Sequence, residues 1–283
     1  MSNVTLFSGN SAIPVIPEEL RGALRSNTLF DLAKSAGSSS RRISIKGNKF
    51  RMVVNGEEVA VTADPLDVVI LGASPAFLRQ WYARAYDPKD TSPPDCWSND
   101  NQKPHENSAN PQAQYCNKCP KNIAGSGVGT AKACQTKVNI AVVLANNIEG
   151  GDIFEMTVPA QSIFTKFDQA TQRGGLLGYS NLLSSRNTDP RMVVTRIAFD
   201  EESATPLLWF SGVSYVPSEL LAVTVAKSET EEAKRAIVFN YPKPKDDGPQ
   251  AAPAAPAKPS APAPVAKSMD NAAKILEEWG DEA

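Results

Sequence analysis

All four cysteines of this 283-residue chain lie within 39 positions, in the pattern Cys96-x19-Cys116-x2-Cys119-x14-Cys134. A Cys-x2-Cys pair brings two thiolates to one tight turn, and two further cysteines complete a tetrahedron around a metal ion. The segment around them, residues 91–136, is rich in Pro, Asn, Ser and Gly, so it cannot fold by burying a core of its own. We therefore predict a structural Zn²⁺ site whose metal supplies about 10 kcal/mol or more of folding free energy.

The same four residues permit other arrangements. Four thiolates also bind iron–sulfur clusters, and reduced structural thiols or a disulfide pair are further alternatives. Because four Cys already fill a tetrahedral site, we expect the only histidine, His105, to be a loop residue. The predicted site then has no open position for catalysis.

The sequence carries no targeting or membrane signal. Its start, MSNVTLFSGN, lacks the charged and apolar parts of a signal peptide, and no run reaches the roughly 18–20 apolar residues of a membrane helix. We expect an intracellular protein with no membrane partner, where thiols stay reduced.

Period-two patterning predicts a three-strand meander over residues 41–61. Three runs of alternating side chains are separated by Gly47-Asn48 and by Asn55-Gly56, and such dipeptides accept the positive φ of tight hairpin turns. Further strands are predicted at 66–71, 138–144, 153–158, 192–199 and 207–216, and helices at 160–171, at 218–236 and from Pro17. Residues 75–86 fit a strand or a helix. The fold class is therefore α+β and β-rich, with one domain over residues 1–245 that is interrupted by the cysteine segment.

Charge is distributed unevenly along the chain. Residues 1–245 carry 26 Lys and Arg against 24 Asp and Glu, whereas residues 246–283 carry 3 against 7, which gives the net charge of −2. No acidic residue occurs between Asp31 and Glu57, or from Asn107 to Ile148. Stretches that contain cations alone indicate a surface facing a polyanion, although a solvated sheet face explains part of the first one.

The end of the chain is a tether with an acidic tip. Residues 246–266 are rich in Pro and Ala and predict a semi-rigid linker. Residues 267–283 form an acidic amphipathic peptide, which a solvated terminus also explains. Its expected partner-binding residues are Ile275, Leu276, Trp279, Asp281 and Glu282.

Two groups of phage proteins resemble this chain. Asp95-Cys96-Trp97-Ser98, the stretch from Cys116 to Asn122 and Ala131-Lys132-Ala133-Cys134 are similar to elements that recur in a group of tailed-phage proteins taken as DNA-binding. In architecture the chain resembles the single-stranded DNA-binding proteins of T-even phages. That resemblance implies an OB-like barrel core interrupted by a zinc-binding loop and an acidic tail that recruits replication proteins. Those proteins use one His and three Cys, whereas this chain offers four Cys.

We therefore predict a non-enzymatic protein that binds single-stranded DNA in phage replication, recombination or repair, within the host cytoplasm. Single strands need cations for phosphates and aromatic faces for bases. The expected DNA-binding residues are Arg41, Arg42, Lys46, Lys49, Arg51, Arg79, Trp81, Tyr82, Arg84, Tyr86, Trp97, Lys118, Lys121, Lys132 and Lys137.

Two other functions are alternatives. The first is a zinc-containing protein-interaction or transcription-regulating module. The second is a nuclease, for which Asp64, Asp67 and Asp95 are candidates but form no recognisable motif. With a single histidine, nucleophilic catalysis that depends on His has little support.

Overall fold

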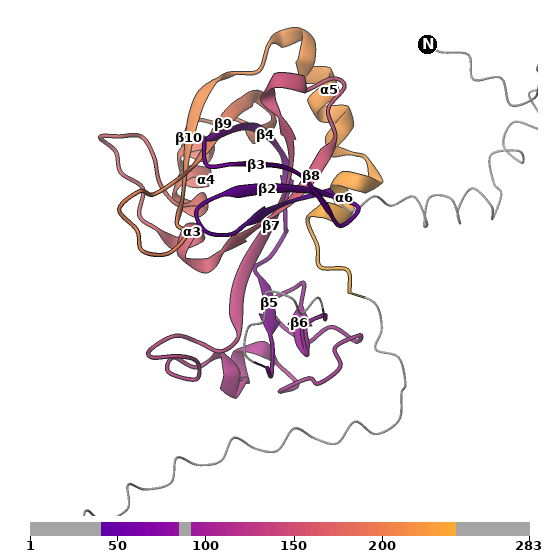
Figure 1. Cartoon of the computed structure of the whole chain (residues 1–283), viewed down its shortest axis with the longest axis vertical. Helices are drawn as coiled ribbons and strands as arrows, with labels where there is room; N and C mark the ends of the chain where they lie inside the picture. Colours follow the sequence, from indigo (N-terminus) through magenta and orange to yellow (C-terminus); the bar gives the residue numbers. More distant parts are fainter. Residues whose placement is uncertain (1–40, 85–91, 242–283) are drawn as a thin grey trace, which may run out of the picture. The chain divides into compact units, whose positions relative to one another are not determined.

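The computed structural model describes residues 41–84 and 92–241, and its centre is a mixed β-sheet that curls into a half-barrel (Figure 1). This confirms the predicted β-rich α+β class. The strand order along the main path is β10-β9-β4-β7-β8-β1-β2-β3. These strands are β1 (Arg41–Ile45), β2 (Phe50–Val54), β3 (Glu57–Thr62), β4 (Leu66–Ala73), β7 (Gln135–Leu144), β8 (Ile153–Pro159), β9 (Val193–Phe199) and β10 (Leu208–Tyr215).

The first three strands form the predicted meander. Both residues of the turn Gly47-Asn48 have positive φ, at 60° and 52°, and so do both residues of Asn55-Gly56, at 54° and 88°. Two consecutive positive φ values are what a two-residue hairpin turn with the native twist requires. The strands pair antiparallel throughout the sheet except for β1 and β8, which are parallel.

Helices cover both faces of the sheet. On one face a cluster that includes Phe50, Ile140 and Met156 packs against α3 (Ala160–Phe164) and α4 (Leu176–Ser185). On the other face a second cluster, which includes Val69 and Val143, packs against α5 (Ser218–Ser228) and α6 (Glu231–Ala236). The strands of the sheet interior are buried on both sides, and this explains their long apolar runs.

Two predicted helices differ from the structure. The helix expected at 160–171 ends at Phe164, because the chain then turns back through the Asp168–Arg173 bridge. The helix expected at 218–236 is two helices. They separate at Thr230, whose hydroxyl accepts a hydrogen bond from the Ala233 amide and so starts α6 as an N-cap. Helix α4 was not predicted.

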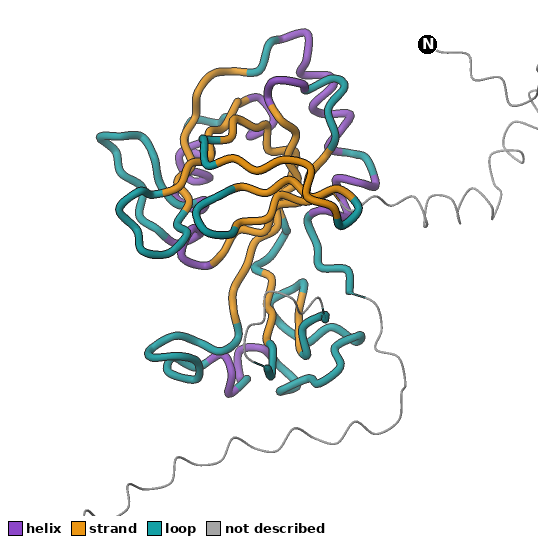
Figure 2. The backbone as a smooth tube through the Cα atoms, in the orientation of Figure 1, coloured by secondary structure: helices purple, strands orange, loops and turns teal. Residues whose placement is uncertain are grey.

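Strand β7 extends beyond the half-barrel into the cysteine segment. Its first residues pair with β5 (Leu78–Trp81), which in turn pairs with β6 (Cys96–Ser98). The ambiguous run at 75–86 thus contains a short strand, Leu78–Trp81, and the other residues of the run that the structure describes, 75–77 and 82–84, are loop. Loops and two single-turn 3₁₀ helices, η1 (Cys116–Lys118) and η2 (Pro120–Asn122), complete this region, which we call the cysteine module, residues 92–136 (Figure 2).

Several predictions fall outside the described residues: the helix from Pro17, Tyr86, the linker and the acidic tip. Among the described helices, none combines the length and the apolar character needed to cross a membrane.

Candidate nucleic-acid groove and cysteine site

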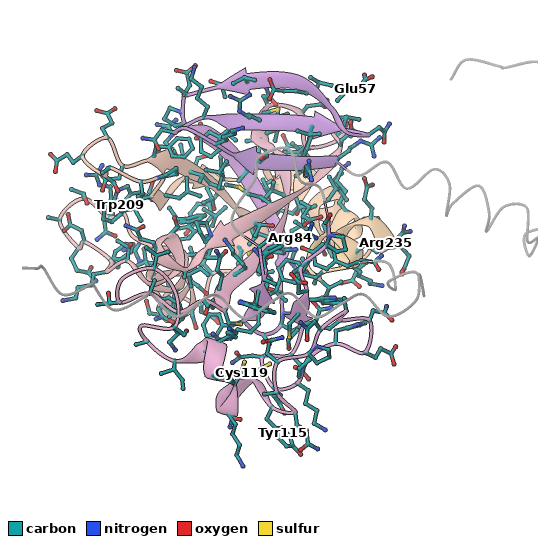
Figure 3. All side chains as sticks on the ribbon, turned by 60° about the horizontal axis from the view of Figure 1, so that its bottom comes forward. Glu57, Arg84, Tyr115, Cys119, Trp209 and Arg235 are labelled. Carbon is teal, nitrogen blue, oxygen red and sulfur yellow. The ribbon has the colours of Figure 1, made fainter. Side chains whose placement is uncertain are left out.

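The structure brings the four cysteines together. All four are buried free thiols, and they line one cavity of about 10 Å³, roughly the space of a single water-sized sphere. Cys96 comes from β6, Cys116 is the first residue of η1, Cys119 follows η1, and Cys134 immediately precedes β7. The sulfur atoms gather near Cys119 in Figure 3. Three segments of the chain therefore bring the predicted ligands to one small cavity.

The chemistry of this donor set fits one divalent ion. Burial raises the pKa of the Cys96 and Cys116 thiols and brings that of Cys134 to about 12, so a metal would have to displace their protons. Within residues 41–84 and 92–241, no group of three or more His, Cys, Asp or Glu side chains is placed so that it could hold a metal ion as it stands. His105 lies outside the thiol cavity, with its ring stacked on Trp97 at 3.8 Å between centroids.

A groove of about 1050 Å³ lies on the sheet face that carries α5 and α6, beside α6. Its floor is formed by side chains of β1, β8 and β7. One wall consists of α6 and the residues that follow α6 as far as Tyr241. Gln80 of β5 lines the groove near the cysteine module. Four cationic side chains face two acidic ones along this lining: Arg41, Arg42, Lys137 and Arg235 against Glu155 and Glu232. We call this surface the β1–α6 groove.

Burial sets the electrostatics of the groove floor. Glu155 is paired with Arg42 in the β1–β8 register. Burial raises the pKa of its carboxyl to about 7, although Arg42 and a 3.1 Å hydrogen bond from Asn139 Nδ2 favour the charged form. Burial also lowers the pKa of the Lys137 ammonium. The floor therefore holds two groups that are costly to keep charged without a partner.

Two neighbouring tyrosines, of which one lines the groove, lie close to the cysteine module. Tyr241 is the residue in the lining, and Tyr82 is 41% exposed. Burial raises the pKa of Tyr241, and the neighbouring Tyr82 and Glu155 add to that effect. The backbone before Tyr241 is held because the Asn99 side chain both donates to and accepts from Phe239, at 3.0 and 2.9 Å.

The predicted cations of the first two strands divide into two groups. Arg42, Lys46 and Lys49 are exposed. Arg41 is ion-paired with Asp152 and Glu232, at 3.1 and 2.9 Å. Arg51 is ion-paired with Glu58 at 2.6 Å. Intramolecular ion pairs compete with phosphate for these two guanidinium groups.

Two predicted aromatic platforms are buried instead. Trp97 is only 2% exposed and packs with Leu78 and Phe239. Trp81, 9% exposed, packs against Cys96 and Cys134. We correct both assignments, because a ring enclosed by protein offers no face to a base. Their physical role is to join the cysteine module to β5 and to the C-terminal chain.

The predicted cations of the cysteine module also have different settings. Lys118 is exposed, the Lys121 ammonium lies 5.0 Å from the centroid of the Trp81 ring, and Lys132 Nζ donates to Asn122 Oδ1 at 3.2 Å. Arg84 is exposed at the end of the first described range. Lys137, which lies just after the module in β7, lines the β1–α6 groove, and the three predicted module lysines do not.

Sequence reasoning missed much of the groove lining. Arg235 falls within the helix predicted at 218–236, Glu155 falls within the strand predicted at 153–158, and Tyr241 falls in no predicted element. The period-two pattern of β8 does place Glu155 and Thr157 on one face and Met156 on the other. That pattern marks a polar sheet face, but nothing in it shows that α6 lies beside that face.

The chain was compared with protein-family models, with curated proteins and with solved structures, and no match was found in any of the three.

Proposed function

We propose that this chain is a zinc-containing, single-stranded DNA-binding protein of the tailed-phage type, without catalytic activity, that acts in replication, recombination or repair. The observation that carries the proposal is the β1–α6 groove, where cations outnumber carboxylates and Tyr241 lies in the lining with Tyr82 beside it. A cationic groove accepts the phosphates, and aromatic faces stack on unpaired bases whatever their sequence.

Within the proposal, the four cysteines hold one structural Zn²⁺. The cavity of about 10 Å³ favours a single ion over an iron–sulfur cluster. The metal would supply the stabilisation that this loop-rich segment lacks. The metal would also hold β6 and its partner β5 in place, and Gln80 of β5 lines the groove.

The OB-like likeness belongs to the proposal as well. The half-barrel has the curvature expected of such a core, but eight strands follow its main path, whereas an OB barrel has five. The functional parallel therefore rests on the groove and the cysteine module rather than on strand order. The acidic tip, residues 267–283, is proposed to recruit replication or recombination proteins.

Binding of a fluorescent oligonucleotide by the full-length chain tests the proposal. We expect sequence-tolerant binding at low salt. Arg42→Gln should weaken it several-fold and reduce the slope of log affinity against log salt by about 1. Arg186→Gln, an exposed arginine outside the groove lining, is the matched control and should bind like wild type. Absence of binding at low salt would refute the proposal.

A second function is favoured by one observation. In the loop between the third and fourth cysteines, Ile123 is 61% exposed and Val128 is 95% exposed. Exposed aliphatic side chains on a loop suit a protein partner, as expected of a zinc-containing interaction or transcription-regulating module. That function predicts partner capture that depends on Val128, together with negligible affinity for oligonucleotides.

A further inference from the structure

Arg79 lies where the three cysteine-bearing segments meet. It belongs to β5 and is paired with Ser98 of β6 on one side and with Thr136 of β7 on the other. Its position in the sequence, among aromatic residues and arginines, predicted a contact with DNA. The structure gives its guanidinium a different set of neighbours.

Three hydrogen bonds fix the Arg79 guanidinium. Nε donates to Asn101 Oδ1 at 2.6 Å, and Nη1 donates to Asn122 Oδ1 at 3.0 Å and to Thr136 Oγ1 at 2.9 Å. Asn101 follows the strand of Cys96, Asn122 follows Cys119, and Thr136 is two residues after Cys134. One side chain thus ties together all three segments that supply thiols.

Asn122 extends the same network to a ligand-bearing turn. Its amide Nδ2 donates to the carbonyl of Cys116 at 2.9 Å, while its Oδ1 also accepts from Lys132 Nζ at 3.2 Å. The orientation of the Cys-x2-Cys turn is therefore coupled to Arg79 through one amide. Lys132, a predicted DNA contact, belongs to this network.

The charge of Arg79 has no carboxylate partner among the described residues. The side chain lines the same small cavity as the four cysteines. A divalent ion with four thiolates carries a net charge of −2, and such a buried anionic centre requires nearby positive charge and hydrogen-bond donors.

We infer that Arg79 is a positioning residue of the four-cysteine metal site, which orients the ligand segments and offsets the negative charge of the metal–thiolate centre. The inference rests on the proposed zinc site and reassigns Arg79 from the DNA interface. It also explains why a guanidinium is suited to this position. Its planar fork holds donors on three nitrogens at fixed positions and so reaches acceptors in separate segments, whereas the donors of Lys all lie on one nitrogen.

The test is the rate at which the full-length, zinc-loaded protein releases Zn²⁺ to a chelating dye. Outer-shell substitutions commonly weaken metal binding by about 10–100-fold, so Arg79→Gln should release zinc in that range faster than wild type. Arg79→Lys, which keeps the charge, should be intermediate. Arg84→Gln, which removes an exposed arginine close by in the sequence, should release zinc like wild type.

Two further measurements separate this role from folding and from DNA contact. Thr136→Val removes one acceptor of the Arg79 guanidinium and keeps the positive charge of Arg79, so it should accelerate zinc release a few-fold. This variant tests the inference if the Arg79→Gln protein does not fold. The Co²⁺-substituted Arg79→Gln protein should show altered sulfur-to-metal absorption bands. With zinc in excess, the salt slope of its oligonucleotide binding should match that of wild type.

The outcomes are distinguishable. Wild-type protein that holds zinc, with Arg79→Gln and Thr136→Val releasing it at the same rate, would overturn the inference and leave the proposed zinc site intact. A salt slope lowered by about 1 in Arg79→Gln, with unchanged zinc release, would return Arg79 to the DNA interface. Wild-type protein that binds no metal would overturn the zinc site and the inference together.

Discussion

Glu155 shows how single residues set the behaviour of the β1–α6 groove. Its carboxyl lies on the groove floor, in register with Arg42, and burial raises its pKa from 4.5 to about 7. An ionised carboxylate there would repel phosphate, whereas a protonated one would not. The groove is therefore expected to bind a polyanion better in mildly acidic solution.

Replacing Glu155 should reveal the cost of its burial. The folded state holds the proton more tightly than the unfolded chain. The resulting stabilisation is complete below pH 4.5 and is lost as the pH rises through 7. Glu155→Gln keeps the shape and removes the titration. It should therefore raise the free energy of unfolding by about 1–2 kcal/mol at pH 8, allowing for solvent screening, and by little at pH 5.

Urea unfolding at the two pH values measures this difference. Glu149→Gln removes a carboxylate from an exposed loop, so it should change the free energy of unfolding by a similar small amount at pH 5 and at pH 8. An equal effect of Glu155→Gln at pH 5 and pH 8 would mean that the carboxyl titrates normally.

Tyr82 is an exposed aromatic side chain beside the lining of the β1–α6 groove, where it could stack on a base. It is 41% exposed and neighbours Tyr241. Removing one stacking face should cost about 1–3 kcal/mol of binding, so Tyr82→Ala should weaken oligonucleotide affinity roughly 5- to 150-fold. Tyr82→Phe, which keeps the face, should bind nearly as well as wild type. Equal affinities of the Ala variant and wild type would remove Tyr82 from the interface.

Residue type alone does not separate stacking platforms from core. Trp81, Tyr82 and Trp97 were all expected to contact DNA, yet only Tyr82 is exposed. The two tryptophans are buried because the loop-rich cysteine module has few aliphatic side chains and uses these rings as its core. That choice depends on tertiary packing, which local sequence does not encode.

At the scale of elements, tight turns and alternation were the reliable signals. The meander of β1 to β3 was predictable because two Gly/Asn dipeptides fix both turns and the register. Helix α4 was missed because Gly178, Ser180 and Asn181 lower its helix propensity. Leu176, Tyr179 and Leu183 nevertheless recur at i, i+3 and i+7, and their burial against the sheet stabilises the helix.

The cysteine module should behave as an element that depends on its metal. Cys119→Ser removes one of four predicted ligands, so it should abolish the binding of about one zinc per chain and loosen residues 92–136. The half-barrel has its own apolar clusters and should stay folded.

Metal analysis combined with hydrogen exchange separates these outcomes. Protection should fall in the module and persist in β4, β7 and β9. Glu106→Gln, at an exposed position of a module loop outside the lining of the thiol cavity, is a control that should retain zinc. Native protein without metal would contradict the prediction.

At the scale of the whole molecule, the net charge of −2 combines a slightly cationic body and an acidic end. If residues 267–283 compete with DNA for the cationic surface, their deletion should strengthen oligonucleotide binding at low salt and abolish partner recruitment. The difference should vanish at high salt, where both interactions are screened. Unchanged affinity at low salt would argue against competition by the tip.

The most direct test of the account is a salt titration of single-stranded against double-stranded DNA binding by the full-length, zinc-loaded protein. We predict that single strands are bound whatever their sequence, and that the logarithm of the affinity falls steeply and linearly with the logarithm of the salt concentration. The duplex should bind more weakly than the single strand at every salt concentration. Equal or tighter binding of the duplex, or no binding of single strands at low salt, would contradict the account.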